Sequence, residues 1–77
     1  MYAVVFTYSF SQDCAVYLFE MEQAAKDFLK ENFDEEVRIE VQENKHSPYA
    51  YLSDDGWYGE IIDNGDSAYY HIARVYE

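Results

Sequence analysis

A chain of 77 residues is long enough for one domain, residues 1–77, and too short for two. Hydrophobic residues make up 49% of it and aromatic residues 19%, which excludes an intrinsically disordered chain. Five basic residues against sixteen acidic ones give a net charge of −11, so direct binding to nucleic acid or to an anionic membrane is not expected.

The cysteine content and the hydropathy pattern predict a cytoplasmic protein. Cys14 is the single cysteine and cannot form an internal disulfide, as is usual in a reducing compartment. No apolar run is long enough to span a bilayer, and the start MYAVVFTYSF lacks the basic segment of a secretory signal. Cys14 itself is expected to be a small buried residue, because free cysteines are mostly buried and no neighbouring base activates this one.

The N-terminal stretch predicts a hairpin of two strands. Residues 2–10 alternate aromatic and β-branched side chains and carry apolar residues on both faces, which is typical of a central strand. Ser11, Gln12 and Asp13 supply a polar turn. Residues 14–19 (CAVYLF) then predict a second strand that leads directly into a helix.

The helix is predicted over Met21–Phe33, the only stretch with clear helical spacing of apolar residues. A helix this short is marginal on its own in water, so it needs a sheet against its apolar side, above all against Phe28 and Leu29. The residues expected on that side are Met21, Ala24, Ala25, Phe28, Leu29 and Phe33.

The next stretch, DEEVRIEVQENK, allows two interpretations. Its three β-branched residues alternate as in a strand, whereas Phe33, Val37 and Val41 are spaced by four and would continue the apolar stripe of the helix. We favour a helix that continues to about Asn44, straight or kinked near Asp34, over an additional strand.

The remaining chain predicts a three-stranded meander. Ser47-Pro48 ends the helix, because the residue before proline is pushed toward extended geometry. Strands at 49–53 and 57–63 flank an Asp-Asp-Gly turn, and an Asp-Asn-Gly-Asp turn leads to a last strand at 68–76. The fold class is therefore α+β: an antiparallel sheet of about five strands, in the order β-β-α-β-β-β, with one main helix packed on one face.

Few residues are candidates for chemistry. Neither histidine, His46 or His71, has a second histidine or cysteine at metal-ligand spacing. Two turns contain several potential oxygen ligands for a metal, but their spacing does not match that of the calcium loop. The preference of these residue types for turns explains their presence. The residues are Asp54, Asp55, Asp63, Asn64 and Asp66. We expect no metal, no cofactor and no catalysis. The alternative is a small-ligand or catalytic site in which Glu60 orients His71 as a general base.

Aromatic residues crowd the C-terminal strands beyond what one face of a small sheet buries. We expect some of them to be exposed and to bind a protein partner, because tyrosine and tryptophan anchor interfaces at low entropic cost. The alternative is that they only stiffen cross-strand pairs. The candidate partner-binding residues are Tyr49, Tyr51, Trp57, Tyr58 and Tyr69.

A dense acidic run on the helix is the second candidate for partner binding. Its carboxylates are Glu31, Asp34, Glu35, Glu36, Glu40 and Glu43. On a helix they would form a negative ridge, which favours a DNA mimic that occupies the basic groove of a nucleic-acid-binding protein. The alternative is a solvated face that keeps the protein soluble.

Four segments carry a resemblance to a known family, and they are VFTYSF, VYLFEMEQAAKDFLKENFDEEVRIEVQEN, AYLSDDGWYGEI and RVY. Together they resemble a family of small acidic proteins of Firmicutes that are often encoded near mobile elements. The resemblance implies this origin and a single domain, but no activity and no catalytic residue. A Gly-Trp pair tends to precede the hairpin in that family, where this chain has His46-Ser47-Pro48.

The functional hypothesis is a cytoplasmic, non-enzymatic interaction module that binds a protein partner or a second copy of itself. The first alternative is a DNA-mimic inhibitor of a host nucleic-acid-binding or defence protein. The second alternative is the small-ligand or catalytic site around His71 and Glu60.

Overall fold

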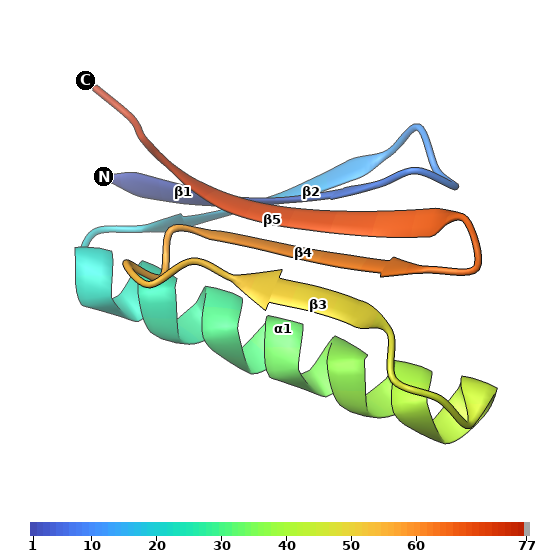
Figure 1. Cartoon of the computed structure of the whole chain (residues 1–77). Helices are drawn as coiled ribbons and strands as arrows, with labels where there is room; N and C mark the ends of the chain where they lie inside the picture. The colour runs from blue at the N-terminus through green and yellow to red at the C-terminus, as the bar shows by residue number, and fades with distance from the viewer. Residues whose placement is uncertain (77) are drawn as a thin grey trace.

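The computed structural model describes residues 1–76, which form five strands and one helix. In chain order the elements are β1 (Tyr2–Tyr8), β2 (Cys14–Phe19), α1 (Glu22–Asn44), β3 (Tyr49–Leu52), β4 (Tyr58–Asp63) and β5 (Asp66–Arg74). The helix lies along one face of the sheet and leaves the other face uncovered (Figure 1). This arrangement confirms the predicted α+β fold and its element order.

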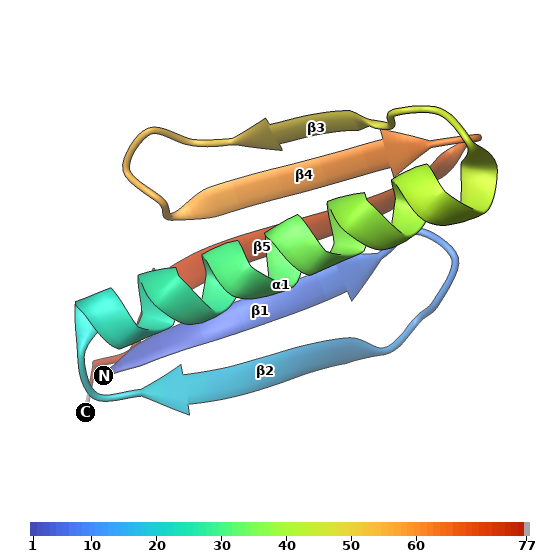
Figure 2. The same cartoon turned by 90° about the horizontal axis from the view of Figure 1, so that it is seen from below.

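The five strands form a single antiparallel sheet in the order β2-β1-β5-β4-β3. β1 lies between β2 and β5, as its apolar residues on both faces predict. The last three strands form the predicted meander, and β5 closes it by pairing with β1. Seen from the helix side, α1 runs across the middle of the sheet and leaves β2 and β3 at the edges (Figure 2).

The helix extends to Asn44, so the strand interpretation of residues 37–41 is wrong. Its buried residues Ala25, Leu29 and Phe33 are four apart, and Val37 continues the same stripe against the core. That spacing lets one face of a long helix follow the sheet, which a strand at the same position would not do. Lys45 caps the end of the helix: its backbone is left-handed with φ 62°, and its N–H donates to the Val41 carbonyl.

Two residues of the predicted apolar side do not reach the core. Met21 precedes the first turn of α1 and is 69% exposed, and Ala24 is also exposed. Met21 sits where the helix emerges from the β2 connection and the sheet does not cover it, whereas Ala24 lies beside the buried stripe, next to the fully buried Ala25. Phe28 is half-buried, and its ring stacks on that of Phe6 with the centroids 5.8 Å apart.

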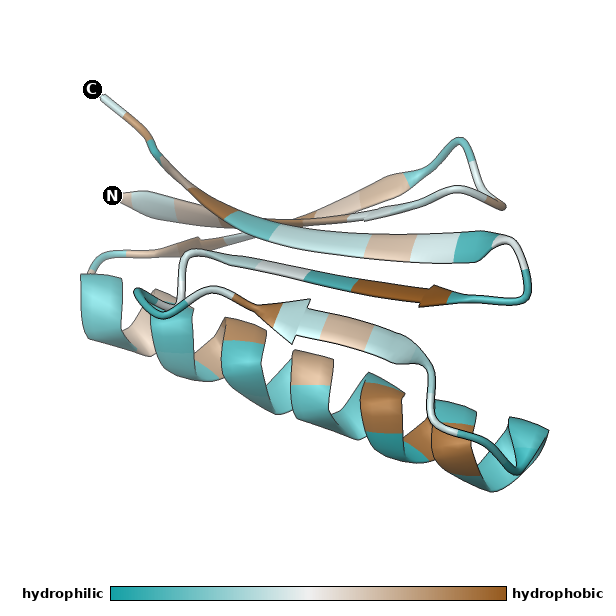
Figure 3. Cartoon of the chain, in the orientation of Figure 1, coloured by the Kyte–Doolittle hydropathy of each residue, from teal (hydrophilic) through white to brown (hydrophobic). Residues whose placement is uncertain are grey.

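The core lies between the helix and the inner face of the sheet. Leu29 and Val4 are fully buried, and Tyr70 is 2% exposed. Around them the cluster is completed by Phe6, Ala25, Phe33, Ile61, Ala68 and Ile72. Colouring by hydropathy shows mostly hydrophilic residues along the helix and a hydrophobic segment toward the C-terminal end of β4 (Figure 3).

β1 ends two residues before its predicted end, and β5 keeps its predicted length but begins and ends two residues earlier. The register between β1 and β5 runs from the Tyr2–Arg74 pair to the Tyr8–Ala68 pair. Phe10 lies beyond it and is 68% exposed, and Tyr76 is 86% exposed. The predicted ends at residues 10 and 76 are therefore wrong.

Candidate interaction surfaces

The face of the sheet that the helix leaves uncovered is called the open face. Successive side chains of a strand point to opposite faces. Because Val4, Phe6, Ile61 and Tyr70 lie in the core, the residues on either side of them in each strand point away from the helix. The open face is formed by Ala3, Val5 and Thr7 of β1, Cys14, Val16 and Leu18 of β2, Tyr49 and Tyr51 of β3, Tyr58, Glu60 and Ile62 of β4, and Ser67, Tyr69, His71 and Ala73 of β5.

The open face is apolar and aromatic, and it is most exposed along its two edge strands, whereas its middle is partly buried and Ala3 is only 6% exposed. Leu18 is 60% exposed, Tyr49 57%, Val16 54% and Tyr51 46%. Glu60 is the one carboxylate among its residues, in a chain with sixteen acidic residues. An antiparallel sheet with one solvated face normally shows polar residues there. This face departs from that pattern.

Four of the five aromatic residues predicted to bind a partner share the open face, namely Tyr49, Tyr51, Tyr58 and Tyr69. The rings of Tyr51 and Tyr58 are 6.4 Å apart, and the Tyr58 hydroxyl donates to Glu60 at 3.0 Å. Desolvation and the Glu60 carboxylate raise the pKa of Tyr58. Tyr58 therefore remains a neutral hydrogen-bonding group on an apolar surface.

Trp57 lies apart from the four tyrosines, immediately before β4. Its ring meets the Tyr2 ring edge-on at 6.0 Å, and the Arg74 guanidinium lies 5.3 Å from its centroid. The Lys26 ammonium lies 6.0 Å from the same centroid. Trp57 therefore joins the N-terminal end of the helix to the strands.

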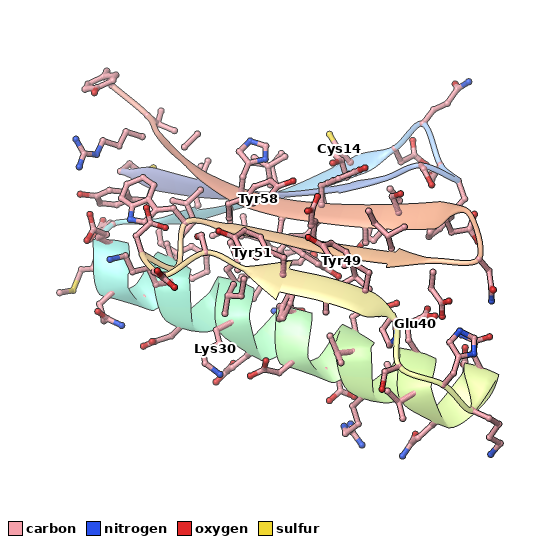
Figure 4. The ribbon with its side chains drawn as sticks, viewed as in Figure 1. Cys14, Lys30, Glu40, Tyr49, Tyr51 and Tyr58 are labelled. Atoms are coloured by element: carbon pink, nitrogen blue, oxygen red, sulfur yellow. The ribbon has the colours of Figure 1, made fainter. Side chains whose placement is uncertain are left out.

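Cys14 also belongs to the open face, so the prediction that it is buried is wrong. It begins β2, an edge strand, and its side chain lies on the side of the sheet away from the helix (Figure 4). The helix is the only layer packed against the sheet within residues 1–76. A residue at this position has nothing to cover it.

His71 and Glu60 lie diagonally on neighbouring strands of the open face, since His71 pairs with Tyr58 and Glu60 with Tyr69. Glu60 accepts its hydrogen bond from Tyr58, and none joins it to His71 in the part of the chain that the structure describes. The pocket beside the β4–β5 turn is lined by neither residue. A catalytic role for this pair stays a prediction.

The helix carboxylates predicted to form one ridge are divided between two environments. Asp34 pairs with Lys30 at 2.6 Å and Glu35 pairs with Arg38, so basic residues of the helix compensate both. Glu31 is exposed. Glu36, Glu40 and Glu43 instead face a pocket of about 250 Å³ between the end of the helix and the β4–β5 turn.

This acidic pocket is defined by five carboxylates, Glu36, Glu40, Glu43, Asp63 and Asp66, together with Asn44 and Asn64. The last helical turn carries no basic residue, although cations are favoured at that end of a helix dipole. Within residues 1–76, no group of three or more His, Cys, Asp or Glu side chains is arranged to hold a metal ion.

A hydrogen-bonded network closes one side of the acidic pocket. His46 Nε2 lies 2.8 Å from Asp63 Oδ1, and the Asn44 amide donates to both Asp63 and Glu40. The Asp63 carboxylate raises the pKa of His46 above its ordinary value of 6.5. Burial, with Asp63 and the neighbouring glutamates Glu36 and Glu43, raises the pKa of Glu40 above 4.5. The sequence offered no local signal for this network, because its members are up to 23 positions apart.

We expect the free energy of unfolding to decrease as the pH rises from 6 to 8. A group whose pKa is raised by folding stabilises the folded chain. This contribution is complete at pH values below the pKa of the unfolded state, and it is lost as the pH rises through the pKa of the folded state. His46 loses this contribution as the pH rises above 6.5, and Glu40 loses its own as the pH rises above 4.5. Urea unfolding at several pH values measures the slope.

The His46→Gln variant is the control for this slope, because its amide can still donate to Asp63 but does not titrate in this range. Its free energy of unfolding should change less between pH 6 and pH 8 than that of the wild type. An equal slope in both proteins would show that His46 is not responsible. In a histidine NMR titration, Asp63→Asn should lower the midpoint of His46 toward its ordinary value.

Asp55 closes the turn before β4 through its side-chain hydrogen bonds. Asp55 Oδ1 accepts hydrogen bonds from the Ser53 hydroxyl at 2.7 Å and from the Trp57 N–H at 3.0 Å. These bonds lower the pKa of Asp55. They are the ordinary bonds by which a short polar side chain closes a turn.

No protein-family model, curated protein or solved structure matches this chain. The resemblance to small acidic proteins of Firmicutes therefore stays a prediction. Among the residues described, no helix has the length and apolar character needed to cross a membrane.

Proposed function

We propose that this chain is a non-enzymatic protein-interaction module whose binding surface is the open face. The observation that supports the proposal is an uncovered sheet face with one carboxylate and with Val16, Leu18, Tyr49 and Tyr51 about half exposed or more. Each Å² of apolar surface left in water costs about 25 cal/mol. Large exposed apolar residues gathered on one uncovered face are typical of a binding surface. A partner that covers it removes that cost.

The tyrosines give the open face its specificity. A buried tyrosine contributes a large ring and a hydroxyl that needs a hydrogen-bond partner, and it has few rotatable bonds to fix. Tyr49, Tyr51 and Tyr58 lie on two neighbouring strands, with Tyr51 opposite Glu60 in the register. Binding is therefore expected to concentrate on the β3–β4 side of the face.

Affinity capture with matched tyrosine variants tests the proposal. Tagged wild-type protein is incubated with an extract of the source organism, and the retained proteins are compared with those retained by Tyr51→Ala and Tyr76→Ala. Tyr51 is on the open face, whereas Tyr76 is more exposed but follows the sheet. Tyr51→Ala should weaken retention at least about tenfold, and Tyr76→Ala should not. Equal retention by all three proteins would contradict the proposal.

A second candidate, the DNA-mimic inhibitor, is favoured by the acidic pocket. Glu36, Glu40 and Glu43 take part in none of the salt bridges found among residues 1–76, and they face Asp63 and Asp66 across the pocket. A basic groove would be attracted by this concentration of charge. Glu36→Gln with Glu43→Gln should then abolish capture of a nucleic-acid-binding protein, and added salt should weaken it. Capture that is unchanged by both treatments would exclude mimicry.

A further inference from the structure

The extent of the open face is the first reason to ask whether a second copy covers it. Five strands spaced about 4.8 Å apart and about 20 Å long give a projected area of roughly 500 Å². The accessible area of a surface with projecting side chains exceeds its projection. The face therefore approaches the roughly 800 Å² that each partner contributes to a standard interface.

The distribution of charge is the second reason. Two copies of a chain with a net charge of −11 repel each other, and the least repulsive contact is the surface with the fewest carboxylates. The open face carries one carboxylate, Glu60. The helix, on the opposite side of the sheet, carries Glu31, Asp34, Glu35 and further carboxylates. Figure 1 shows the helix on one side of the sheet and the uncovered face on the other.

A face-to-face dimer keeps these charges apart. Two sheets stack about 10 Å apart, and the two helices then lie on the outer sides of the stack. The helix carboxylates of the two copies are separated by more than the Debye length, about 8 Å at physiological ionic strength. The resulting order of layers is helix, sheet, sheet, helix, and it gives the apolar residues of both faces a common core.

Pairing through the edge of β2 is the competing mode of self-association, and charge disfavours it. Antiparallel pairing of two β2 strands about Val16 and Tyr17 brings Asp13 of one copy opposite Glu20 of the other at both ends. Like charges directly opposite each other are destabilising. A foreign partner is also less favoured at the open face, because one carboxylate and one imidazole offer little charge pattern to select it.

We infer that the open face binds a second copy of this chain, so that the protein is a symmetric dimer with its helices outward. This inference rests on the proposed interaction role of the open face and names the partner. The contact is isologous, with each copy contributing the same surface. It buries Val16 and Leu18 of the β2 side together with Tyr49 and Tyr51 of the β3 side.

Sedimentation equilibrium of the purified protein, from about 1 μM to about 1 mM, tests the inference with two matched valine variants. Val16 is 54% exposed on the open face, and Val41 is 39% exposed on the helix. The wild type should form dimers. Val16→Glu should raise the dimer dissociation constant at least about tenfold, and Val41→Glu should leave it unchanged. Added salt should strengthen the dimer, because it screens repulsion between like-charged copies.

Three results would overturn the inference. They are a wild type that is monomeric throughout, a dimer that Val16→Glu leaves intact, and a dimer that Val41→Glu dissociates equally. As a second readout, dilution should shift amide NMR signals of the open-face residues and leave those of the outer side of α1 unchanged. A monomeric wild type whose captured proteins are still lost in Tyr51→Ala would overturn only the dimer, and the interaction module would stand. Monomers with no capture that depends on Tyr51 would overturn both.

Discussion

Leu29→Ala is expected to lower the free energy of unfolding by about 2–5 kcal/mol. Leu29 is fully buried on α1, between Ala25 and Phe33, at the centre of the contact with the sheet. Truncation removes apolar contacts and leaves a cavity that the helix and sheet cannot fully close. A domain of this length is typically stable by about 4–12 kcal/mol, so the substitution removes a large part of the total free energy of unfolding. Urea unfolding at low protein concentration measures the change.

Met21→Ala is the matched control for Leu29→Ala, because the spacing of apolar residues assigns both side chains to the same face of the helix. The structure places Met21 at the N-terminal boundary of α1, 69% exposed and without a side-chain capping hydrogen bond. Its truncation should change the free energy of unfolding by less than about 0.5 kcal/mol. Equal losses in the two variants would mean that the core does not lie where the structure places it.

The order of elements could be predicted because each depends on local patterns. Leu29 and Phe33 have helical spacing, and Asn64-Gly65 is a turn that needs left-handed backbone at both positions, with observed φ of 52° and 84°. The extent of α1 was harder to predict, because Val37 and Val41 fit a helix and a strand equally well by spacing. Contact between Val37 and the core, which is tertiary, decides in favour of the helix.

The composition of the open face could be predicted only in part. Alternation places Tyr49 and Tyr51 on one face of β3, but only the register with β4 and β5 shows that Tyr58 and Tyr69 share it. Val16 and Leu18 were missed, because an apolar strand such as CAVYLF does not reveal which of its faces is covered. The acidic pocket was also missed, because it joins the end of α1 to a turn about 20 residues later.

Gly59→Val is the second substitution with a large expected effect. Gly59 is buried in β4 beneath the helix, and a Cβ atom there would lie 3.0 Å from Phe33 Cδ2 and 3.4 Å from Leu52 Cδ1. The absence of a side chain thus lets α1 approach β4. Gly59→Ala is expected to lower the free energy of unfolding by about 1–3 kcal/mol, and Gly59→Val by more, because the ring must move in a closely packed core.

A double-mutant cycle with Phe33→Leu shows whether crowding is the cause. Removing the ring should recover part of the loss in Gly59→Ala, giving a coupling of at least about 0.5 kcal/mol. Gly65→Ala is the control, because Gly65 has φ +84° and a methyl group added there would have nothing within 4 Å, so its cost comes from the backbone alone. Phe33→Leu should not relieve it. If the two alanine variants respond alike to Phe33→Leu, steric contact with the helix does not explain the glycine in β4.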